Sequence, residues 1–253
     1  MIVDLYIPCY IDQYQPATAR NTLKLLQKVG CGVNYNIEQT CCGQPAFEDG
    51  YRDACKEVGE KLIREFQDER YIVCPGPGCV KTIRQYYPAL FHNSAMHNEF
   101  KLVQKNFFEL SEFLVDVMNA SEFGAIYKAK AIVHNSCSWQ YHPKAKSTVQ
   151  ETQEAHKSES ALHTLLRKVK DLEIIESEDA WPNCGMGGGL DRKNETLTVG
   201  MAETFLHSIA HTGADTIISN DPLCLMHLQG VITKQNLNYK VAHMADVLAA
   251  GWE

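Results

Sequence analysis

The sequence has little of what marks a membrane protein or a nucleic-acid-binding protein. Its 253 residues contain no run close to the roughly 18 consecutive apolar residues that a membrane span requires. Lysine and arginine number 24 against 31 aspartates and glutamates, a net charge of −7, whereas phosphate binding normally needs a basic face. The first ten residues lack a basic region followed by an apolar stretch and a cleavage site. We therefore expect a cytoplasmic protein with no nucleic-acid partner and no membrane span.

Catalytic motifs are equally scarce. No Ser–His–Asp arrangement, paired-carboxylate motif or ferredoxin-type Cys-x2-Cys-x2-Cys run stands out, and no flavin site is evident. The glycine-rich run 185–189 misses the dinucleotide pattern because Leu190 stands where the final glycine belongs. We expect this run to form a tight turn that brings backbone against a cysteine site.

Cysteine, in contrast, is abundant. Ten cysteines in a chain of this size, with no sign of export, indicate metal ligands or redox groups rather than a disulfide scaffold. Hydrophobic residues make up 45% of the chain and charged residues 22%, which is ample for a buried core in one large domain or two small ones. The cysteines are therefore the first candidates for a functional site.

Apolar periodicity predicts strands that alternate with helices. We expect strands at 2–7, 33–37, 71–73, 131–134, 172–175, 216–219 and 241–242. Helices are expected over 16–29, 48–68, 79–87, 160–169 and 192–211, after residue 224, and at the end of the chain. This alternation predicts βαβ units with parallel sheet, and so an α/β fold.

The cysteines repeat with the strands. Cys9, Cys42 and Cys79 follow three successive strands, and three further cysteines do the same at offsets of 128, 142 and 145 residues, namely Cys137, Cys184 and Cys224. Open α/β sheets place ligand sites at the carboxyl ends of their strands. We therefore predict two pseudo-equivalent βαβ modules, 1–120 and 121–253, each with a small parallel sheet and a cysteine metal site at its strand ends.

Three segments outside the repeat have simpler interpretations. The polar stretch 144–160, across which the offset mainly grows, is expected to be a surface insertion. Residues 121–130 are the expected linker between the modules. The apolar stretch 107–117 is expected to be a buried connecting helix, with partner docking as its functional alternative.

Four thiolates can meet in the first module. Cys9, Cys41, Cys42 and Cys79 supply the number that a [4Fe–4S] cluster needs. A disulfide between the adjacent Cys41 and Cys42 would be strained, and Gly43 gives the backbone freedom to turn close to a cluster. Structural zinc suits four thiolates equally well, and buried free thiols are the remaining alternative. Spacing alone leaves all three open.

The second module offers three thiolates, from Cys137, Cys184 and Cys224. An iron–sulfur cluster there would need Asp221 or a solvent molecule as its fourth ligand. Zinc would instead use His227, which stands in a Cys-x2-His relation to Cys224. An empty site is the third alternative.

Other cysteines and histidines have structural interpretations. Cys31 and Cys55 are expected in the core, and Cys74 is expected to be a buried thiol, with a displaced fifth ligand as its alternative. Three histidines are expected to be hydrogen-bonded residues of loops or strand ends: His134, His142 and His243.

The doubled cysteine order resembles a known family. The order is Cys9, Cys41-Cys42-Gly43 and Cys79, repeated as Cys137, Asn183-Cys184-Gly185 and Cys224. It is similar to the duplicated cysteine-rich CCG domain found in heterodisulfide reductase and in the iron–sulfur subunits of glycolate and glycerol-3-phosphate oxidising enzymes. The resemblance covers nearly the whole chain, and the segments 38–54 and 220–230 look characteristic of it.

This chain departs from the full family motif, which has five cysteines per half and ends in Cys-x2-Cys. Gly76 and Asp221 occupy the first position of each Cys-x2-Cys, and Asn183 replaces the first cysteine of the second CCG. The noncubane double cluster of heterodisulfide reductase is therefore not expected. We expect one [4Fe–4S] cluster in the first module and either iron–sulfur or zinc in the second.

The resemblance implies an iron–sulfur electron-transfer subunit of an oxidoreductase that oxidises L-lactate to pyruvate. It also implies two partner subunits, one of them carrying ferredoxin-like clusters, so that this chain would be a non-autonomous subunit. Two alternatives stay open: a zinc-binding, non-redox interaction subunit, and a subunit that reduces thiols or heterodisulfides, which would need the missing cysteines or an open iron.

Overall fold

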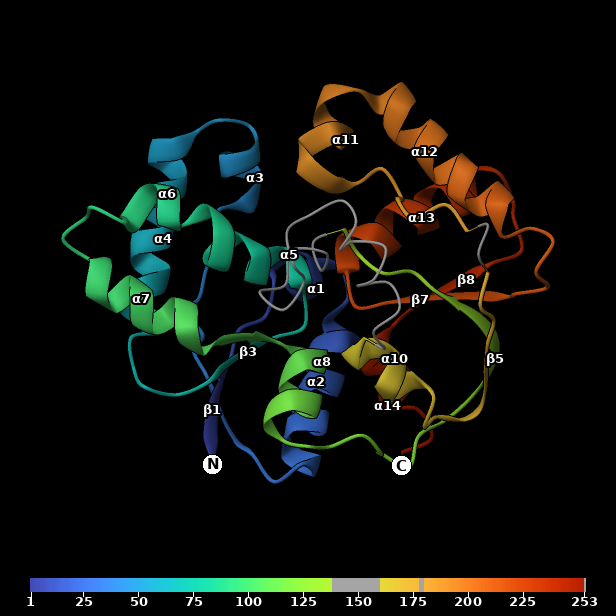
Figure 1. Cartoon of the computed structure of the whole chain (residues 1–253), viewed down its shortest axis with the longest axis horizontal. Helices are drawn as coiled ribbons and strands as arrows, with labels where there is room; N and C mark the ends of the chain where they lie inside the picture. Colours follow the sequence, from blue (N-terminus) through green and yellow to red (C-terminus); the bar gives the residue numbers. More distant parts are fainter. Residues whose placement is uncertain (138–159, 178–179, 253) are drawn as a thin grey trace, which may run out of the picture. The chain divides into compact units, whose positions relative to one another are not determined.

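The computed structural model describes residues 1–137, 160–177 and 180–252. The chain folds into two compact units, Met1–Met118 and Asn119–Glu253. Each unit has its own sheet (Figure 1). Each also has its own cluster of buried hydrophobic residues. All but the last residue of the expected insertion at 144–160 lies outside the described residues.

The first unit is built on a four-stranded parallel sheet with the strand order β2-β1-β3-β4. The central strands β1 and β3 are almost entirely buried, as expected where helices cover both faces of a parallel sheet. The strand bounds are β1 Ile2–Leu5, β2 Gly32–Tyr35, β3 Ile72–Cys74 and β4 Phe107–Glu109. Because β2 and β3 lie on opposite sides of β1, the strand order reverses at β1.

Short helices connect these strands. Proline is the first residue of α2, α5 and α6, a position where its missing N–H leaves no helical hydrogen bond unmade. The helices are α1 Cys9–Tyr14, α2 Pro16–Lys28, α3 Gln44–Glu48, α4 Arg52–Glu65, α5 Pro77–Lys81, the π-helical turn η1 Thr82–Tyr86, α6 Pro88–Phe91, α7 His97–Asn106, α8 Leu110–Glu112 and the π-helical turn η2 Phe113–Val117.

The second unit repeats this plan. Its sheet is also parallel and four-stranded, with the order β6-β5-β7-β8. The strands are β5 Ile126–Val133, β6 Lys170–Ile174, β7 Thr216–Ser219 and β8 Lys240–His243. The helices in its described part are α10 Ala161–Leu166, the 3-10 turn η4 Gly187–Gly189, α11 Leu190–Lys193, α12 Glu195–Ser208, α13 Pro222–Lys234 and α14 Met244–Leu248. The predicted α/β fold, with two parallel-sheet modules, is confirmed.

Two expected helices are interrupted. The helix expected over 48–68 begins only at Arg52, because Gly50 adopts φ +91° and separates the end of α3 from α4. The helix expected over 192–211 is divided at Asn194, whose side chain accepts a hydrogen bond from the Leu197 N–H and so caps α12. Both breaks arise at residue types that favour turns and caps over helix interiors.

Two segments differ from expectation because of strand pairing. The stretch 107–117 starts as strand β4, since Phe107 to Glu109 pair with Ile72 to Cys74, and only then becomes helical. Aromatic residues fit a half-buried sheet position well, and tertiary pairing overrides the helical pattern here. The expected linker 121–130 is strand in its second half, where β5 pairs with β6.

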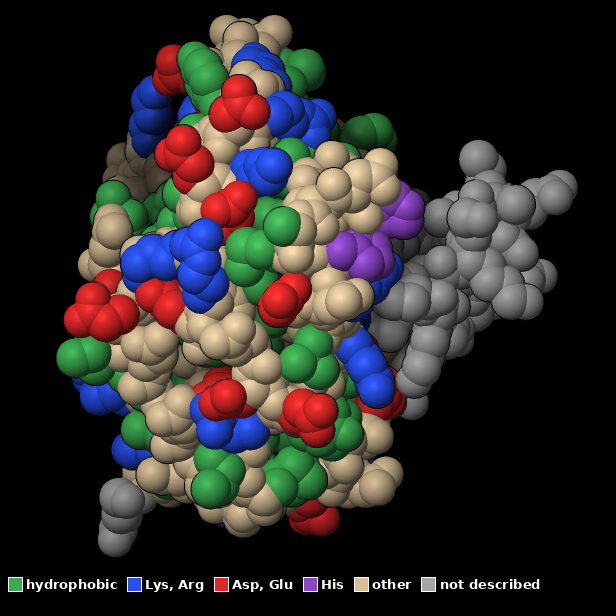
Figure 2. Space-filling model, turned by 90° about the vertical axis from the view of Figure 1, so that its left-hand side faces the viewer, with side chains coloured by type: hydrophobic (Ala, Val, Ile, Leu, Met, Phe, Trp, Pro, Cys, Tyr) green, Lys and Arg blue, Asp and Glu red, His purple; other side chains and the backbone are tan. Residues whose placement is uncertain are grey.

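The acidic excess is dispersed on the face drawn in Figure 2. Acidic and basic side chains lie next to one another there, and neither sign forms a continuous field. Within the part of the chain that the structure describes, no helix combines the length and hydrophobicity needed to cross a membrane.

A buried carboxyl joins β4 to α8. Glu109 is fully buried, and its Oε2 accepts hydrogen bonds from the N–H groups of Ser111 (2.8 Å) and Glu112 (3.3 Å). The side chain of Glu112 accepts the Glu109 N–H in return, which completes a reciprocal cap. Oε1 of Glu109 is buried without a partner among the described residues. Burial raises the pKa of Glu109 to about 7, against the lowering effect of its hydrogen bonds.

Glu109 should make the stability of the metal-free chain depend on pH. Between its ordinary pKa of 4.5 and about 7, the folded state keeps a proton that the unfolded state has released. The free energy of unfolding should therefore fall as the pH rises through this window, by up to about 3 kcal/mol. Glu109→Gln should remove this decline, as measured by urea unfolding at several pH values. The exposed Glu57→Gln should retain it; parallel curves for wild type and Glu109→Gln would refute the assignment.

Candidate metal centres

The cysteines of the first unit lie where its strand order reverses. Cys9 begins α1 directly after β1, Cys41 and Cys42 lie in the loop after β2, and Cys79 lies in α5 after β3. Parallel strands place these ends on one edge of the sheet, and the reversal of strand order opens a crevice between the departing loops. Residues more than thirty positions apart are thereby brought together.

The four thiols of the first unit meet in two close pairs. The Sγ atoms of Cys9 and Cys41 lie 3.8 Å apart, and those of Cys42 and Cys79 lie 3.2 Å apart. All of these cysteines are free thiols. Cys42 and Cys79 are buried, whereas Cys9 and Cys41 are partly exposed. The structure therefore gathers the four candidate ligands named from the sequence at one edge of the sheet.

Two buried tyrosines hold the loop that carries the adjacent cysteines. The hydroxyl of Tyr6 donates to the carbonyl of Thr40 (2.7 Å), and that of Tyr87 donates to the carbonyl of Cys42 (2.9 Å). Both tyrosines are completely buried. The backbone on either side of Cys41 is thus fixed by side chains from the end of β1 and from the segment after α5, which positions the two thiols without the help of regular structure.

Gly43 permits the sharp turn after these cysteines. Its φ of +78° is in the left-handed region, and a Cβ there would lie 2.9 Å from the Sγ of Cys55. Its N–H donates to the Sγ of Cys41 (3.4 Å). The glycine therefore serves two purposes: it lets the chain pass against Cys55, and it directs a backbone donor at a candidate ligand.

The crowded thiols suit a cation. Hydrogen bonding from Cys42 and Cys9 lowers the pKa of Cys41, whereas hydrogen bonding to Cys41 and Cys79 together with burial raises the pKa of Cys42. Neighbouring thiols cannot all ionise unless a positive charge compensates them. Metal binding requires thiolates and supplies that charge. The donor set therefore fits a metal or an iron–sulfur centre.

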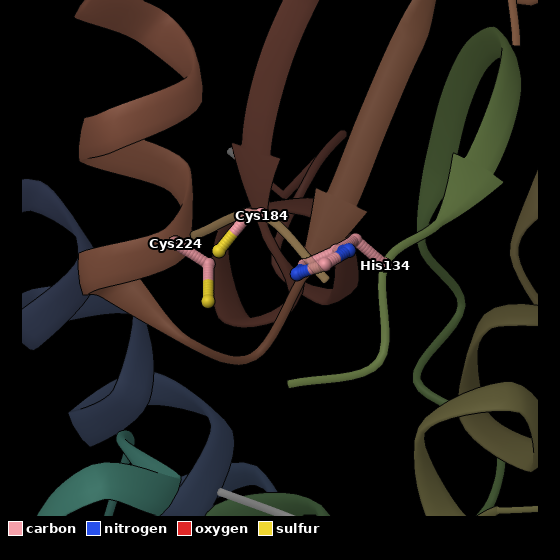
Figure 3. A group of neighbouring side chains, drawn as sticks. All are labelled: His134, Cys184 and Cys224. Carbon is pink, nitrogen blue, oxygen red and sulfur yellow. The ribbon is translucent and has the colours of Figure 1, made fainter. Parts of the chain in front are cut away.

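The second unit groups three ligand atoms from separate loops (Figure 3). His134 follows β5, Cys184 lies in the loop after β6, and Cys224 lies at the start of α13 after β7. One ligand atom from each lies within 4.8 Å of the other two. All three residues are at most 4% exposed. No other set of three His, Cys, Asp or Glu side chains within the described ranges meets this distance.

His134 was not among the ligands named from the sequence. It was expected to be a hydrogen-bonded strand-end residue, yet its Nε2 is buried and has no hydrogen-bond partner in the described part of the chain. Its ring packs edge-on against Phe205, with 5.0 Å between the ring centroids. The available sequence signal was its position directly after a strand, in a His-x2-Cys relation to Cys137.

Cys137 lies beside the glycine run. A Cβ on Gly187 would lie 3.0 Å from the Sγ of Cys137. The charge of Cys137 also contributes to raising the pKa of Cys224, after hydrogen bonding to Cys184 and burial. The turn through Gly185 therefore approaches this cysteine closely, and Gly185 itself adopts φ +92° where a Cβ would lie 2.6 Å from the carbonyl oxygen of Thr198.

The two additional ligands named from the sequence have other partners. Asp221 accepts hydrogen bonds from the hydroxyl of Ser136 and from the N–H of Leu223 (3.0 Å), so it caps α13. His227 donates from Nε2 to the carbonyl of Thr198 (3.2 Å). Neither belongs to the three-residue group around Cys184.

The remaining candidates are mostly buried. Cys31, Cys55 and Cys74 are buried. The thiol of Cys74 donates to the carbonyl of Gly76 (3.4 Å) and also lies in hydrogen-bonding contact with the thiol of Cys79, so it remains next to the first site. His243 donates to the carbonyl of Asn220 and accepts from the N–H of Ala245 at the start of α14. His142 lies outside the described residues.

Comparisons with known proteins agree with this cysteine arrangement. A family model described as "Cysteine-rich domain" (CCG) matches residues 3–84 and 131–229. Lactate utilization protein A of Geobacillus sp. (strain WCH70) is 32% identical over 248 residues, which cover 98% of this chain and 99% of that protein. The protein of the same name from Exiguobacterium sp. (strain ATCC BAA-1283 / AT1b) is 34% identical, and the match covers 98% of this chain and 97% of that protein. The one from Bacillus subtilis (strain 168) is 31% identical, and the match covers 98% of this chain and 99% of that protein.

Gly43 can be tested against a matched glycine. Gly43→Ala should lower the free energy of unfolding by about 1–2 kcal/mol for the left-handed backbone, and by a further 1–3 kcal/mol or so for contact with Cys55. Gly50→Ala has a similar φ of +91° but open space, so it should carry the backbone cost alone. Adding Cys55→Ala to Gly43→Ala should recover most of the difference in urea unfolding. Equal costs for the two single changes would contradict this account.

Proposed function

The chain belongs to the family of cysteine-rich CCG-domain proteins that includes lactate utilization protein A. We propose that it is a cytoplasmic iron–sulfur subunit that carries electrons during the oxidation of L-lactate to pyruvate. The observation that carries the proposal is the gathering of Cys9, Cys41, Cys42 and Cys79 as unbridged thiols at the strand ends of the first sheet.

These four residues are the proposed ligands of one [4Fe–4S] cluster. Within the described residues of the first unit, no three ligand atoms lie within 4.8 Å of one another. Around a single tetrahedral zinc ion with Zn–S distances of about 2.3 Å, sulfur atoms lie about 3.8 Å apart. In a [4Fe–4S] cluster each thiolate binds a different iron, so the cluster, unlike a single ion, does not need all four thiols to converge on one point. A bound cluster supplies reversible one-electron transfer.

The surrounding residues would keep such a centre ordered and partly shielded from water. Tyr6 and Tyr87 fix the backbone of the ligand loop, and the N–H of Gly43 donates to a ligand sulfur. Hydrogen bonds to sulfur and the extent of solvent exposure are among the factors that set the reduction potential of a cluster. Two of the ligands are buried while Cys9 and Cys41 are partly exposed, so an electron would enter and leave on the side of the exposed pair.

The proposed substrate follows from the relatives, whose name refers to lactate utilization. The sequence has no ferredoxin-type Cys-x2-Cys-x2-Cys run, and it offers no base paired with an electrophile for taking a proton or hydride from a hydroxy acid. We therefore assign the ferredoxin-like clusters and the hydroxy-acid site to two partner subunits. The chain alone would then be a relay rather than a complete enzyme.

Metal analysis tests the cofactor directly. Anaerobically purified protein should contain iron and acid-labile sulfide equivalent to about one [4Fe–4S] cluster per chain. Cys42→Ser should remove most of the iron because too few thiolates remain, whereas Cys31→Ser should leave the iron content unchanged. Stoichiometric zinc in the first unit, with no sulfide, would replace this proposal with the non-redox zinc-binding alternative.

Growth tests the physiological role. Deletion of the gene should impair growth on L-lactate and spare growth on pyruvate. The isolated chain should oxidise lactate very slowly, and activity should rise when the partner subunits are added. A deletion strain that grows normally on L-lactate, with no duplicate system present, would move the assignment to another hydroxy acid, with glycolate and glycerol 3-phosphate the next substrates to test.

A further inference from the structure

The donors of the second unit differ in kind from those of the first. Asn183 occupies the position that corresponds to Cys41, so one thiolate is missing. The imidazole of His134 lies instead beside Cys184 and Cys224, with the ligand atoms of all three within 4.8 Å of one another. In Figure 3 the imidazole ring and both sulfur atoms point toward a common region below the strand ends. A set of three thiolates and one imidazole is a common ligand set of structural zinc.

The buried nitrogen of His134 supplies independent support. His134 is 3% exposed, and its Nε2 has no hydrogen-bond partner among the described residues. A buried polar atom left unpaired costs about 1–3 kcal/mol, and such atoms are rare in native proteins. A metal ion bound between Nε2 and the neighbouring sulfurs of Cys184 and Cys224 would satisfy this atom.

The backbone of His134 is held from both directions. Its N–H donates to the carbonyl of Ile218 (2.8 Å), and its carbonyl accepts from the hydroxyl of Ser219 (2.8 Å). Phe205 packs against its ring. The position of the imidazole is therefore fixed by β7 and α12 before any metal binds, which lowers the entropic cost of ordering a ligand.

Cys137 is not one of the three clustered residues, but it is the remaining cysteine of the second unit and can supply the fourth donor. It follows His134 by three residues in the same loop, and its Sγ approaches the backbone at Gly187 so closely that a Cβ there would lie 3.0 Å away. Three thiolates and His134 close the coordination shell of one zinc ion, and the three clustered ligand atoms lie within 4.8 Å of one another, close enough to share a single ion.

We propose that the second unit binds a single zinc ion through His134, Cys184, Cys224 and Cys137. The site is structural, because all four positions of a tetrahedral ion are taken by protein ligands and none is left for a substrate. Zinc would hold together the loops after β5, β6 and β7. This inference does not rest on the proposed electron-transfer function.

The test measures zinc and iron separately in the full-length chain. Anaerobically purified wild-type protein should contain about one zinc per chain, and its zinc X-ray absorption spectrum should show sulfur neighbours at about 2.3 Å and a nitrogen neighbour at about 2.0–2.1 Å. His134→Ala should lower zinc affinity at least about tenfold and so reduce the rise in melting temperature that added zinc gives the metal-depleted wild type. Iron bound by the first unit should not change.

Two further variants keep the test decisive. His134→Cys restores a ligand, so it should retain zinc and replace the nitrogen neighbour with a sulfur, even if the alanine variant folds poorly. His207→Ala changes an exposed histidine on α12 of the same unit and should leave zinc binding unchanged. Unchanged zinc content and affinity in His134→Ala, or a wild-type protein with a second iron–sulfur cluster and no zinc, would overturn the proposal. A wild-type protein that contains zinc but no iron would refute the proposed electron-transfer function and would leave the zinc proposal standing.

Discussion

Parallel pairing of the strands is the constraint on which both candidate metal centres depend. In a parallel sheet every strand ends on the same edge, and a loop that leaves a central strand meets the loops of its two neighbours only where the strand order reverses. β1 lies between β2 and β3, and β5 lies between β6 and β7. Thiols that are far apart in sequence therefore converge without a disulfide or a long rigid motif, and the loops need only short-range restraints such as the tyrosine hydroxyls that hold the Cys41–Cys42 backbone.

The two units show how one scaffold can present different donors. Gly43 and Gly185 both adopt positive φ directly after a cysteine, at φ +78° and +92°, so in each unit a left-handed residue follows the ligand. The residue before that cysteine differs: it is Cys41 in the first unit and Asn183 in the second. Loss of one thiol there, with an unpaired buried imidazole nearby, shifts the second site from the chemistry of a cluster toward that of a single ion.

Much of this arrangement is predictable from the sequence. Short apolar runs locate the strands because buried parallel strands need them, and cysteines placed after those runs indicate the edge of the sheet where the sites lie. The direction of a side chain is harder to predict. His134 looks like any polar residue after a strand, and only the packing of Phe205 and the hydrogen bonds from β7 direct its ring toward Cys184. Strand β4 was missed for a similar reason, because its pairing with β3 is a tertiary contact that outweighs a helical pattern.

The most direct test of the whole account is anomalous diffraction from one anaerobically grown crystal of the chain, recorded at the iron and zinc absorption edges. The account predicts an iron signal at the carboxyl ends of β1, β2 and β3, among the sulfurs of Cys9, Cys41, Cys42 and Cys79. It predicts a separate zinc signal between His134, Cys184 and Cys224. Iron signals in both units, zinc in both units, or metal away from the strand ends would contradict it.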